Sequence, residues 1–188
     1  MEIYVVRHTR VNIAPNICYG QTDVPLADSF EAEATEVRKK LPTLSENVIV
    51  YSSPLSRCRK LAEQLHRGPI QCDPRLMEFH FGDWELKRWD EIPEIHLKTW
   101  AEDFVKLCCP GGESFQELFT RTAAFWEELS QQHADLALVV THGGLIRALF
   151  AHVLQIPFDH AMRISMDYGR VSKIHLNEYG PIVNYINR

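Results

Sequence analysis

The 188-residue sequence lacks the features that mark membrane, secreted and metal-binding proteins. No apolar run approaches the roughly 18 residues that a membrane-spanning helix needs. The first residues enter a strand-like run at once, without a charged leader or a small-residue cleavage site. The five cysteines include no CxxC pair, and no HExxH motif occurs. We therefore expect reduced thiols, a cytoplasmic location, no membrane association and no bound metal.

Positive charge is not in excess either. The chain has 20 Lys and Arg against 25 Asp and Glu, a net charge of −5, which argues against a nucleic-acid partner. A chain of this length buries about 70% of its unfolded surface, so its core needs no disulfide or metal. With no internal repeat, the sequence predicts one globular domain over residues 1–188, acting as a monomer or a homodimer.

Strand-like and helix-like segments alternate along the chain, which predicts an α/β layered domain with a mostly parallel sheet. A terminal hairpin would make that sheet mixed. Residues 76–112 interrupt the alternation with aromatic, acidic and proline residues, and we expect them to form a partly helical excursion from the core. The expected strands are 3–7, 48–51, 70–72, 136–141, 171–176 and 182–186, and the expected helices are 28–41, 54–67, 114–133 and 143–154. We expect Ser53 to cap the second helix, and Ser114 and Glu117 fit the capping-box pattern at the start of the third.

Histidine and arginine side chains follow three of the apolar strands. Arg7 and His8 follow the first, Arg57 lies shortly after the second, and His142 follows the fourth. Because ligands bind beyond the carboxyl ends of strands in open α/β sheets, we expect these side chains to lie together. One histidine at a strand end is more often a packing residue, but two favour a site. Arginines beside helix N-termini indicate an anion, and phosphate suits the bidentate guanidinium best.

Histidine at such a site can attack phosphorus as a covalent nucleophile. Neighbouring arginines would lower its pKa from the usual value of about 6.5 and keep the attacking nitrogen unprotonated. A second, protonated histidine would stabilise charge on the phosphoryl oxygens. The reaction also needs an acid to protonate the departing alkoxide. Glu78, Asp83 and Glu85 are all candidates, and the residues alone do not select among them.

Five motifs, four of which contain these residues, together resemble the histidine phosphatase (phosphoglycerate mutase-like) superfamily, in the order found there. They are Arg7-His8, Ser52-Ser53-Pro54-Leu55-x-Arg57, Leu76-x-Glu78-x-x-Phe81-Gly82-x-Trp84-Glu85, Pro110-Gly111-Gly112-Glu113-Ser114 and Thr141-His142-Gly143-Gly144-x-Ile146-Arg147. The motifs span residues 4–147. Each alone would be weak, whereas the set is highly specific.

The resemblance implies a three-layer α/β/α sandwich and a phosphohistidine mechanism without metal or cofactor. His8 would be the nucleophile, Glu78 the proton donor, and three side chains would complete the phosphate pocket: Arg7, Arg57 and His142. Tyr19, Gly20 and Gly143 match positions that line the substrate pocket of the family. Residues 7–23 are most similar to α-ribazole phosphatases, which remove the 5′-phosphate of a benzimidazole riboside nucleotide in cobalamin biosynthesis.

Some positions depart from the family pattern or have two interpretations. Thr9 and Arg10 stand where the family usually has Gly and Glu or Gln, and we expect Arg10 to contact substrate. Trp84 either packs the excursion onto the sheet or forms an aromatic wall for a planar base. The alternative functions are a phosphoglycerate mutase, a sugar or broad-specificity phosphatase, and a non-catalytic phosphate-binding module. A metallohydrolase is the least supported, because the sequence has no compact His/Asp/Glu cluster beyond the pocket.

Overall fold

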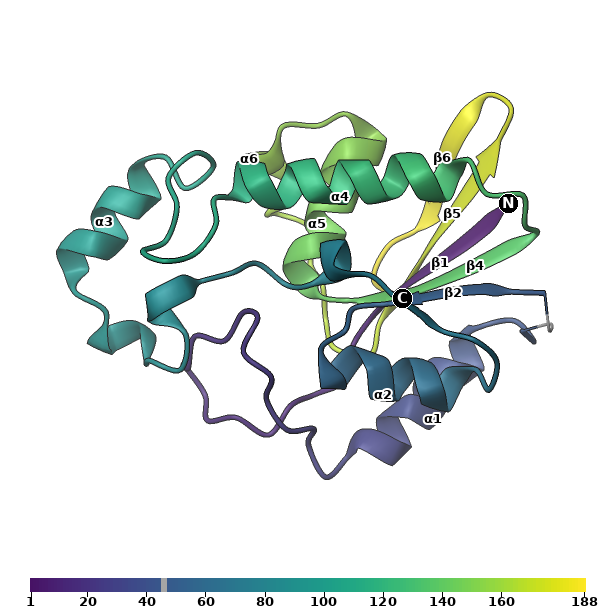
Figure 1. Cartoon of the computed structure of the whole chain (residues 1–188), viewed down its shortest axis with the longest axis horizontal. Coiled ribbons are helices and arrows are strands. Elements are labelled where there is room, and N and C mark those ends of the chain that lie inside the picture. Colours follow the sequence, from purple (N-terminus) through teal and green to yellow (C-terminus); the bar gives the residue numbers. More distant parts are fainter. Residues whose placement is uncertain (45–46) are drawn as a thin grey trace.

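A computed structural model describes residues 1–44 and 47–188 of the chain (Figure 1). At its centre is a mixed sheet of six strands in the order β3-β2-β4-β1-β5-β6. Neighbouring strands from β3 to β1 pair in parallel, whereas β5 pairs antiparallel with both β1 and β6. The predicted mixed sheet and terminal hairpin are therefore confirmed. The strands are β1 (Glu2–Arg7), β2 (Ile49–Ser52), β3 (Gln71–Cys72), β4 (Leu136–Thr141), β5 (Val171–Asn177) and β6 (Gly180–Tyr185).

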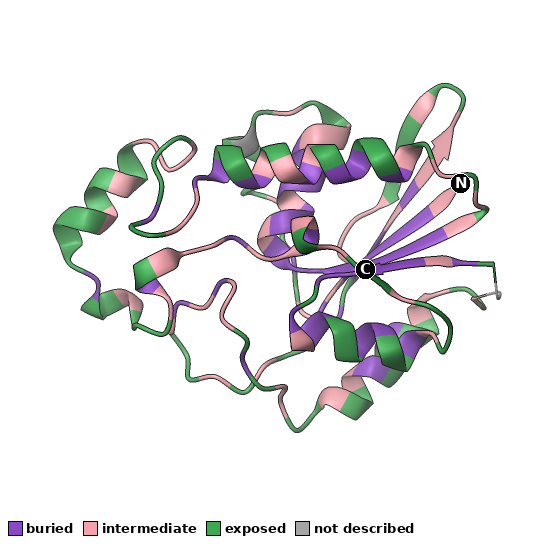
Figure 2. Cartoon of the chain, in the orientation of Figure 1, coloured by how far each residue is buried: buried purple, intermediate pink, exposed green. Residues whose placement is uncertain are grey.

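Helices cover both faces of this sheet, which confirms the three-layer sandwich (Figure 1). Strand β1 is buried on both faces, so its apolar side chains alternate between two cores. Ile3 and Val5 belong to the core beneath α4 (Phe115–Ser130) and α5 (Gly143–Leu154). Tyr4 and Val6 belong to the core beneath α1 (Phe30–Lys40) and α2 (Ser56–Leu65). Figure 2 shows the resulting continuous burial along the central strands.

Helix α4 begins as its sequence predicts. The Ser114 hydroxyl accepts a hydrogen bond from the Glu117 amide at 3.2 Å, and the Glu117 carboxylate accepts one from the Ser114 amide at 2.7 Å. This reciprocal pair is the predicted capping box, which satisfies two amides that the helix itself cannot. The helix ends at Ser130, three residues before the expected end.

Helix α2 begins later than predicted. Ser53 does not cap it, and the helix runs from Ser56 to Leu65 instead of 54–67. The Ser53 hydroxyl lies 2.8 Å from a ring nitrogen of His142, and Leu55 is extended, so the helix cannot start before Ser56. The contact between Ser53 and the distant His142 therefore outweighs the local preference of serine for the helix N-cap.

The excursion between β3 and α4 is partly helical, as expected. It contains α3 (Glu94–Glu102) and three single 3₁₀ turns, η1 (Pro74–Leu76), η2 (Gly82–Trp84) and η3 (Trp89–Glu91). Its aromatic side chains pack on one another and on the start of α4, where the Phe79 and Phe115 rings stack with centroids 4.1 Å apart. The short helix α6 (Phe158–Ala161), after Pro157, was not predicted.

All five cysteines are free thiols. Within the described ranges, the helices are too short or too polar to cross a bilayer.

Candidate active site

The two histidines meet at the carboxyl edge of the sheet. Strands β1 and β4 pair with Arg7 opposite Thr141, so the next residues, His8 and His142, emerge side by side. Their ring centroids are 5.1 Å apart, and both side chains are buried. The His8 amide also donates to the Thr141 carbonyl at 3.0 Å. The predicted convergence at this edge is therefore confirmed.

His8 has a defined tautomer. Its Nδ1 lies 2.7 Å from the Thr9 carbonyl oxygen, which can only accept, so Nδ1 carries the proton and Nε2 has the free lone pair. Burial, followed by the charges of Arg57 and Arg7, holds the pKa of His8 well below its usual value. His8 is consequently a neutral imidazole with an unprotonated Nε2 at neutral pH.

His142 is also held as a neutral ring. Its Nδ1 accepts from the Arg57 Nε at 3.3 Å, which leaves the proton on Nε2 for the Ser53 hydroxyl at 2.8 Å. Burial is again the largest cause that lowers its pKa, followed by Arg57, His8 and Arg7. The protonated His142 considered from the sequence is therefore not the form that this pocket favours, because two guanidinium groups already supply its positive charge.

Arg57 is fully buried at the start of α2. Its terminal nitrogens donate to the carbonyls of Gly20 at 2.6 Å and Thr22 at 2.9 Å, while Nε reaches His142. Among the described residues, the nearest carboxylate is that of the half-exposed Asp23, whose Oδ1 lies 4.0 Å from Arg57 Nη1. Arg57 is thus a buried cation held mainly by neutral acceptors, which makes the pocket attractive to an anion.

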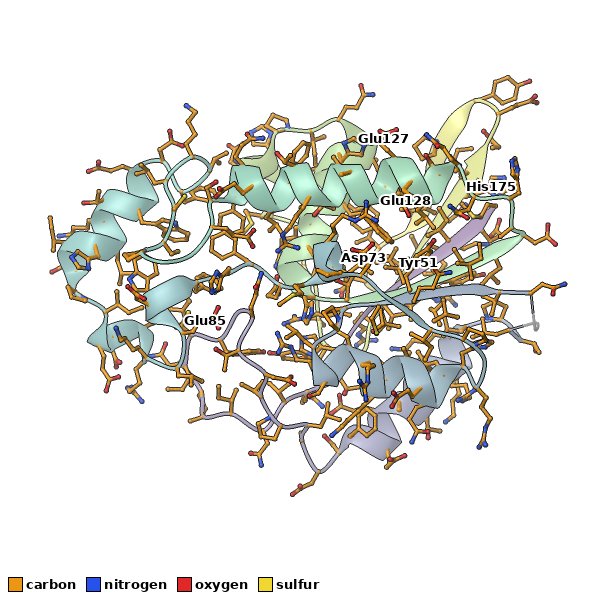
Figure 3. The ribbon with its side chains drawn as sticks, viewed as in Figure 1. Tyr51, Asp73, Glu85, Glu127, Glu128 and His175 are labelled. Carbon is orange, nitrogen blue, oxygen red and sulfur yellow. The ribbon has the colours of Figure 1, made fainter. Side chains whose placement is uncertain are left out.

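The loop that holds Arg57 is itself fixed by Glu85, a residue of the excursion that faces this loop (Figure 3). The Glu85 carboxylate accepts from the amides of Gln21 at 2.9 Å and Thr22 at 2.6 Å, and from the Thr22 hydroxyl. Burial opposes ionisation of Glu85, but these hydrogen bonds outweigh it and hold its pKa below the usual value. Glu85 is therefore an ionised anchor and is not available as a proton donor.

Arg7 lies on the other side of His8. It donates to the Met166 carbonyl and lies over the ring of Tyr168, with Cζ 3.9 Å from the ring centroid. Its Nε is buried and has no hydrogen-bond partner among the described residues. A Cβ on Gly143 would lie 3.2 Å from the Arg7 guanidinium carbon, so glycine gives this group room. An unpartnered, buried N–H of a cation is a donor prepared for an anionic ligand.

Of the three candidate acids, Glu78 is the one at the pocket. Its Oε2 accepts from the Gly144 amide at 3.2 Å, at the start of α5 and two residues from His142. A Cβ on Gly144 would lie 2.4 Å from Glu78 Oε1, so only glycine lets the carboxylate approach. Asp83 is exposed beside Gly111, and Glu85 is fully occupied.

Arg121 on α4, which the sequence did not single out, holds the backbone that carries Glu78. It donates to the carbonyls of Arg75 and Met77, both at 2.7 Å, and of Glu78 at 2.9 Å. It also forms an ion pair of 2.7 Å with Glu113. The motif containing Glu113 was visible, but nothing in the sequence connects Arg121 with residues 75–78.

Tyr168 is the second residue that sequence reasoning missed. Its hydroxyl lies 2.5 Å from that of Tyr19, and its ring centroid is 5.4 Å from that of His8. Tyr19 was expected at the pocket, and its ring centroid is 5.5 Å from the Arg57 guanidinium. Tyr168 lies in a polar segment before the terminal hairpin, where only the following Gly169 hinted at a special backbone conformation.

Two residues predicted to contact substrate have other side-chain partners in the structure. Arg10 is exposed and forms an ion pair of 3.2 Å with Glu33 on α1. Trp84 is 3% exposed and packs against Trp100, with centroids 5.7 Å apart. A contact of either side chain with substrate stays a prediction.

Comparison with known proteins places the chain in a family. Residues 3–188 match the model of the histidine phosphatase superfamily (branch 1). The "Adenosylcobalamin/alpha-ribazole phosphatase" of Escherichia coli K12 is 28% identical to this chain. The match covers all of this chain and 96% of the length of that protein. The "Probable phosphoglycerate mutase GpmB" of Salmonella choleraesuis is 31% identical to this chain. The match covers 95% of this chain and 86% of the length of that protein. The crystal structure of the alpha-ribazole phosphatase from Shigella flexneri superimposes with a TM-score of 0.91 at 26% identity, covering 100% of this chain and 96% of that one. The chain therefore belongs to the histidine phosphatase superfamily.

Proposed function

We propose that this protein is a phosphomonoesterase in which His8 carries the phosphoryl group. The observation that carries the proposal is the state of His8, a buried neutral imidazole with an unprotonated Nε2, 5.1 Å between ring centroids from His142 and flanked by two arginines. A nucleophile of this kind is already deprotonated and needs no separate base. The charges of Arg7 and Arg57 favour an anionic substrate without protonating the nucleophile.

The proposed hydrolysis of the phosphate ester has two steps. The Nε2 lone pair attacks phosphorus as the bond from phosphorus to the ester oxygen breaks, and Glu78, in its protonated form, gives its proton to that oxygen. Water then attacks the phosphohistidine, the Glu78 carboxylate takes a proton from it, and His8 leaves as the neutral ring with inorganic phosphate as product. Arg7 and Arg57 can then stabilise the charge that develops on the phosphoryl oxygens.

We further propose that the substrate is α-ribazole 5′-phosphate, an intermediate of cobalamin biosynthesis. The support is the full-length similarity to the Escherichia coli and Shigella flexneri proteins named for this activity. We expect the enzyme to act in the cytoplasm, as a monomer or a homodimer. The similarity to the Salmonella protein named as a mutase favours one second candidate, a phosphoglycerate mutase.

A substrate screen combined with phosphoenzyme trapping tests both levels of the proposal. We expect α-ribazole 5′-phosphate to be hydrolysed with a higher kcat/KM than 3-phosphoglycerate, sugar phosphates and nucleotides. Rapid quenching should trap a phosphoenzyme that is labile in mild acid and stable in alkali, and that is absent from His8→Ala. Wild-type turnover by His8→Ala would contradict the mechanism. Interconversion of phosphoglycerates without phosphate release would instead favour the mutase, and no turnover of any ester, including aryl phosphates, would indicate a binding module.

A further inference from the structure

Two tyrosines from distant segments face the two pocket arginines. The Tyr168 ring lies 3.9 Å from the Arg7 guanidinium carbon, and the Tyr19 ring lies 5.5 Å from that of Arg57. The two hydroxyls are joined by a hydrogen bond of 2.5 Å. Burial, followed by this bond, raises the pKa of Tyr19, so its hydroxyl stays protonated at neutral pH. The hydrogen-bonded tyrosines thus connect the surroundings of the two cations on either side of His8.

The backbone holds Tyr168 firmly against the strand of the nucleophile. The Gly169 amide donates to the His8 carbonyl, and the Arg7 amide donates to the Arg170 carbonyl, both at 3.1 Å. Gly169 has a φ of +62°, in the left-handed region that favours glycine. The backbone that follows Tyr168 is therefore attached to Arg7 at the end of β1 and to His8 directly after it.

Arg7 has few other contacts that could fix the orientation of its guanidinium group. Its described hydrogen bond goes to the Met166 carbonyl, and its Nε has no partner in the part of the chain that the structure describes. No carboxylate pairs with Arg7 among these residues. An aromatic face beside a guanidinium is attractive and also restricts the plane of the group. Arginine binds phosphate oxygens through N–H groups that lie in one plane, so this recognition requires that the plane of the guanidinium be fixed.

We propose that Tyr168 is a positioning residue of the phosphate pocket, whose ring sets the plane of Arg7 and whose hydroxyl holds Tyr19 beside Arg57. The inference rests on the proposed function, because it assigns Tyr168 to the pocket in which His8 is phosphorylated. It adds a residue from the segment before the terminal hairpin to a site otherwise built from three strand ends and the excursion.

Binding of inorganic phosphate, measured by calorimetry, tests the role without turnover. Tyr168→Leu removes the ring and the hydroxyl, whereas Tyr168→Phe and Tyr19→Phe each remove only the shared hydrogen bond. Tyr168→Leu should weaken phosphate binding by about 2- to 30-fold, the range of a cation–π contact. Its kcat should fall further than its KM rises, because misplaced positioning groups act mainly on the transition state. The two Phe variants should show smaller and equal losses, and the double variant should lose no more than either single one.

A matched control is Tyr185→Leu on β6, which removes a ring that lies 5.5 Å from the Arg188 guanidinium. It should bind phosphate like the wild type. Equal phosphate binding by wild type and Tyr168→Leu would overturn the inference, as would a Tyr168→Phe variant as impaired as Tyr168→Leu. If Tyr168→Leu does not fold, additive losses in the Phe variants would overturn the shared role of the hydroxyls. If the wild type neither binds phosphate nor forms phosphohistidine, the proposed function fails, and this inference with it.

Discussion

The two buried histidines should make the protein less stable as the pH falls below about 6.5, the usual histidine pKa. The pKa values of His8 and His142 are both lowered in the folded protein, with burial as the main cause. In the unfolded chain each ring takes up a proton near its usual pKa. Below that value the unfolded state binds more protons than the folded state, so the stabilising effect is complete at higher pH and is lost on acidification.

The size of the effect follows from proton linkage. One proton bound only by the unfolded state changes the free energy of unfolding by about 1.4 kcal/mol per pH unit. For a histidine that stays neutral in the fold, the loss between pH 7.5 and pH 5.5 integrates to about 1.4 kcal/mol. Two such rings give about 2.7 kcal/mol. A change of this size is a large part of the 5–15 kcal/mol typical of a folded domain.

Urea unfolding at both pH values measures this difference. His8→Asn should lose about 1.4 kcal/mol less than the wild type over this interval, because all other titrating groups are shared. His160→Asn, at an exposed histidine on α6, serves as the control and should behave as the wild type does. Identical pH dependence in wild type and His8→Asn would refute the reasoning, because His8 would then be protonated equally in both states. Because the pKa of His8 is lowered, protonation of His8 should not reduce kcat/KM when the pH first falls below 6.5.

Three further predictions concern the acid, the excursion and metal independence. Glu78→Gln should slow alkyl phosphates about 10²- to 10⁴-fold while nitrophenyl phosphate loses far less, because an alkoxide needs a proton as it leaves; equal losses in steady-state assays would remove Glu78 from that role. Trp84→Ala should lower the free energy of unfolding by about 3–5 kcal/mol, since the indole is buried, and a loss below about 1 kcal/mol in urea would count against a packing role. EDTA should leave turnover unchanged, because Arg7 and Arg57 supply the positive charge that metal ions supply elsewhere; activity lost in EDTA and restored by zinc or magnesium would argue the opposite.

The parts of the site that could be predicted are those that follow a strand directly. His8 and His142 each come immediately after an apolar strand, so the topology of the sheet brings them together whatever the loops do. Glu78 was one of three candidates, and the structure separates it from Glu85 through hydrogen bonds with Gln21 and Thr22 that local sequence does not encode.

The parts that could not be predicted depend on contacts between distant segments. Tyr168 meets Tyr19 across 149 residues, and Arg121 reaches carbonyls 43 to 46 residues away. The late start of α2 has the same origin, because the Ser53 hydroxyl that should cap the helix is taken by His142, 89 residues further on. Capping preference is a local signal, and here a buried contact between strand ends outweighs it.

The grip of Arg121 on residues 75–78 has an evolutionary consequence. Arg121 holds carbonyl oxygens, which every amino acid possesses, and it uses no side chain of the segment that it secures. Replacing a side chain in that segment therefore leaves the hydrogen-bond acceptors of Arg121 in place. Under the proposed function, the backbone that carries the proposed acid can keep its position in evolution while the side chains around it change.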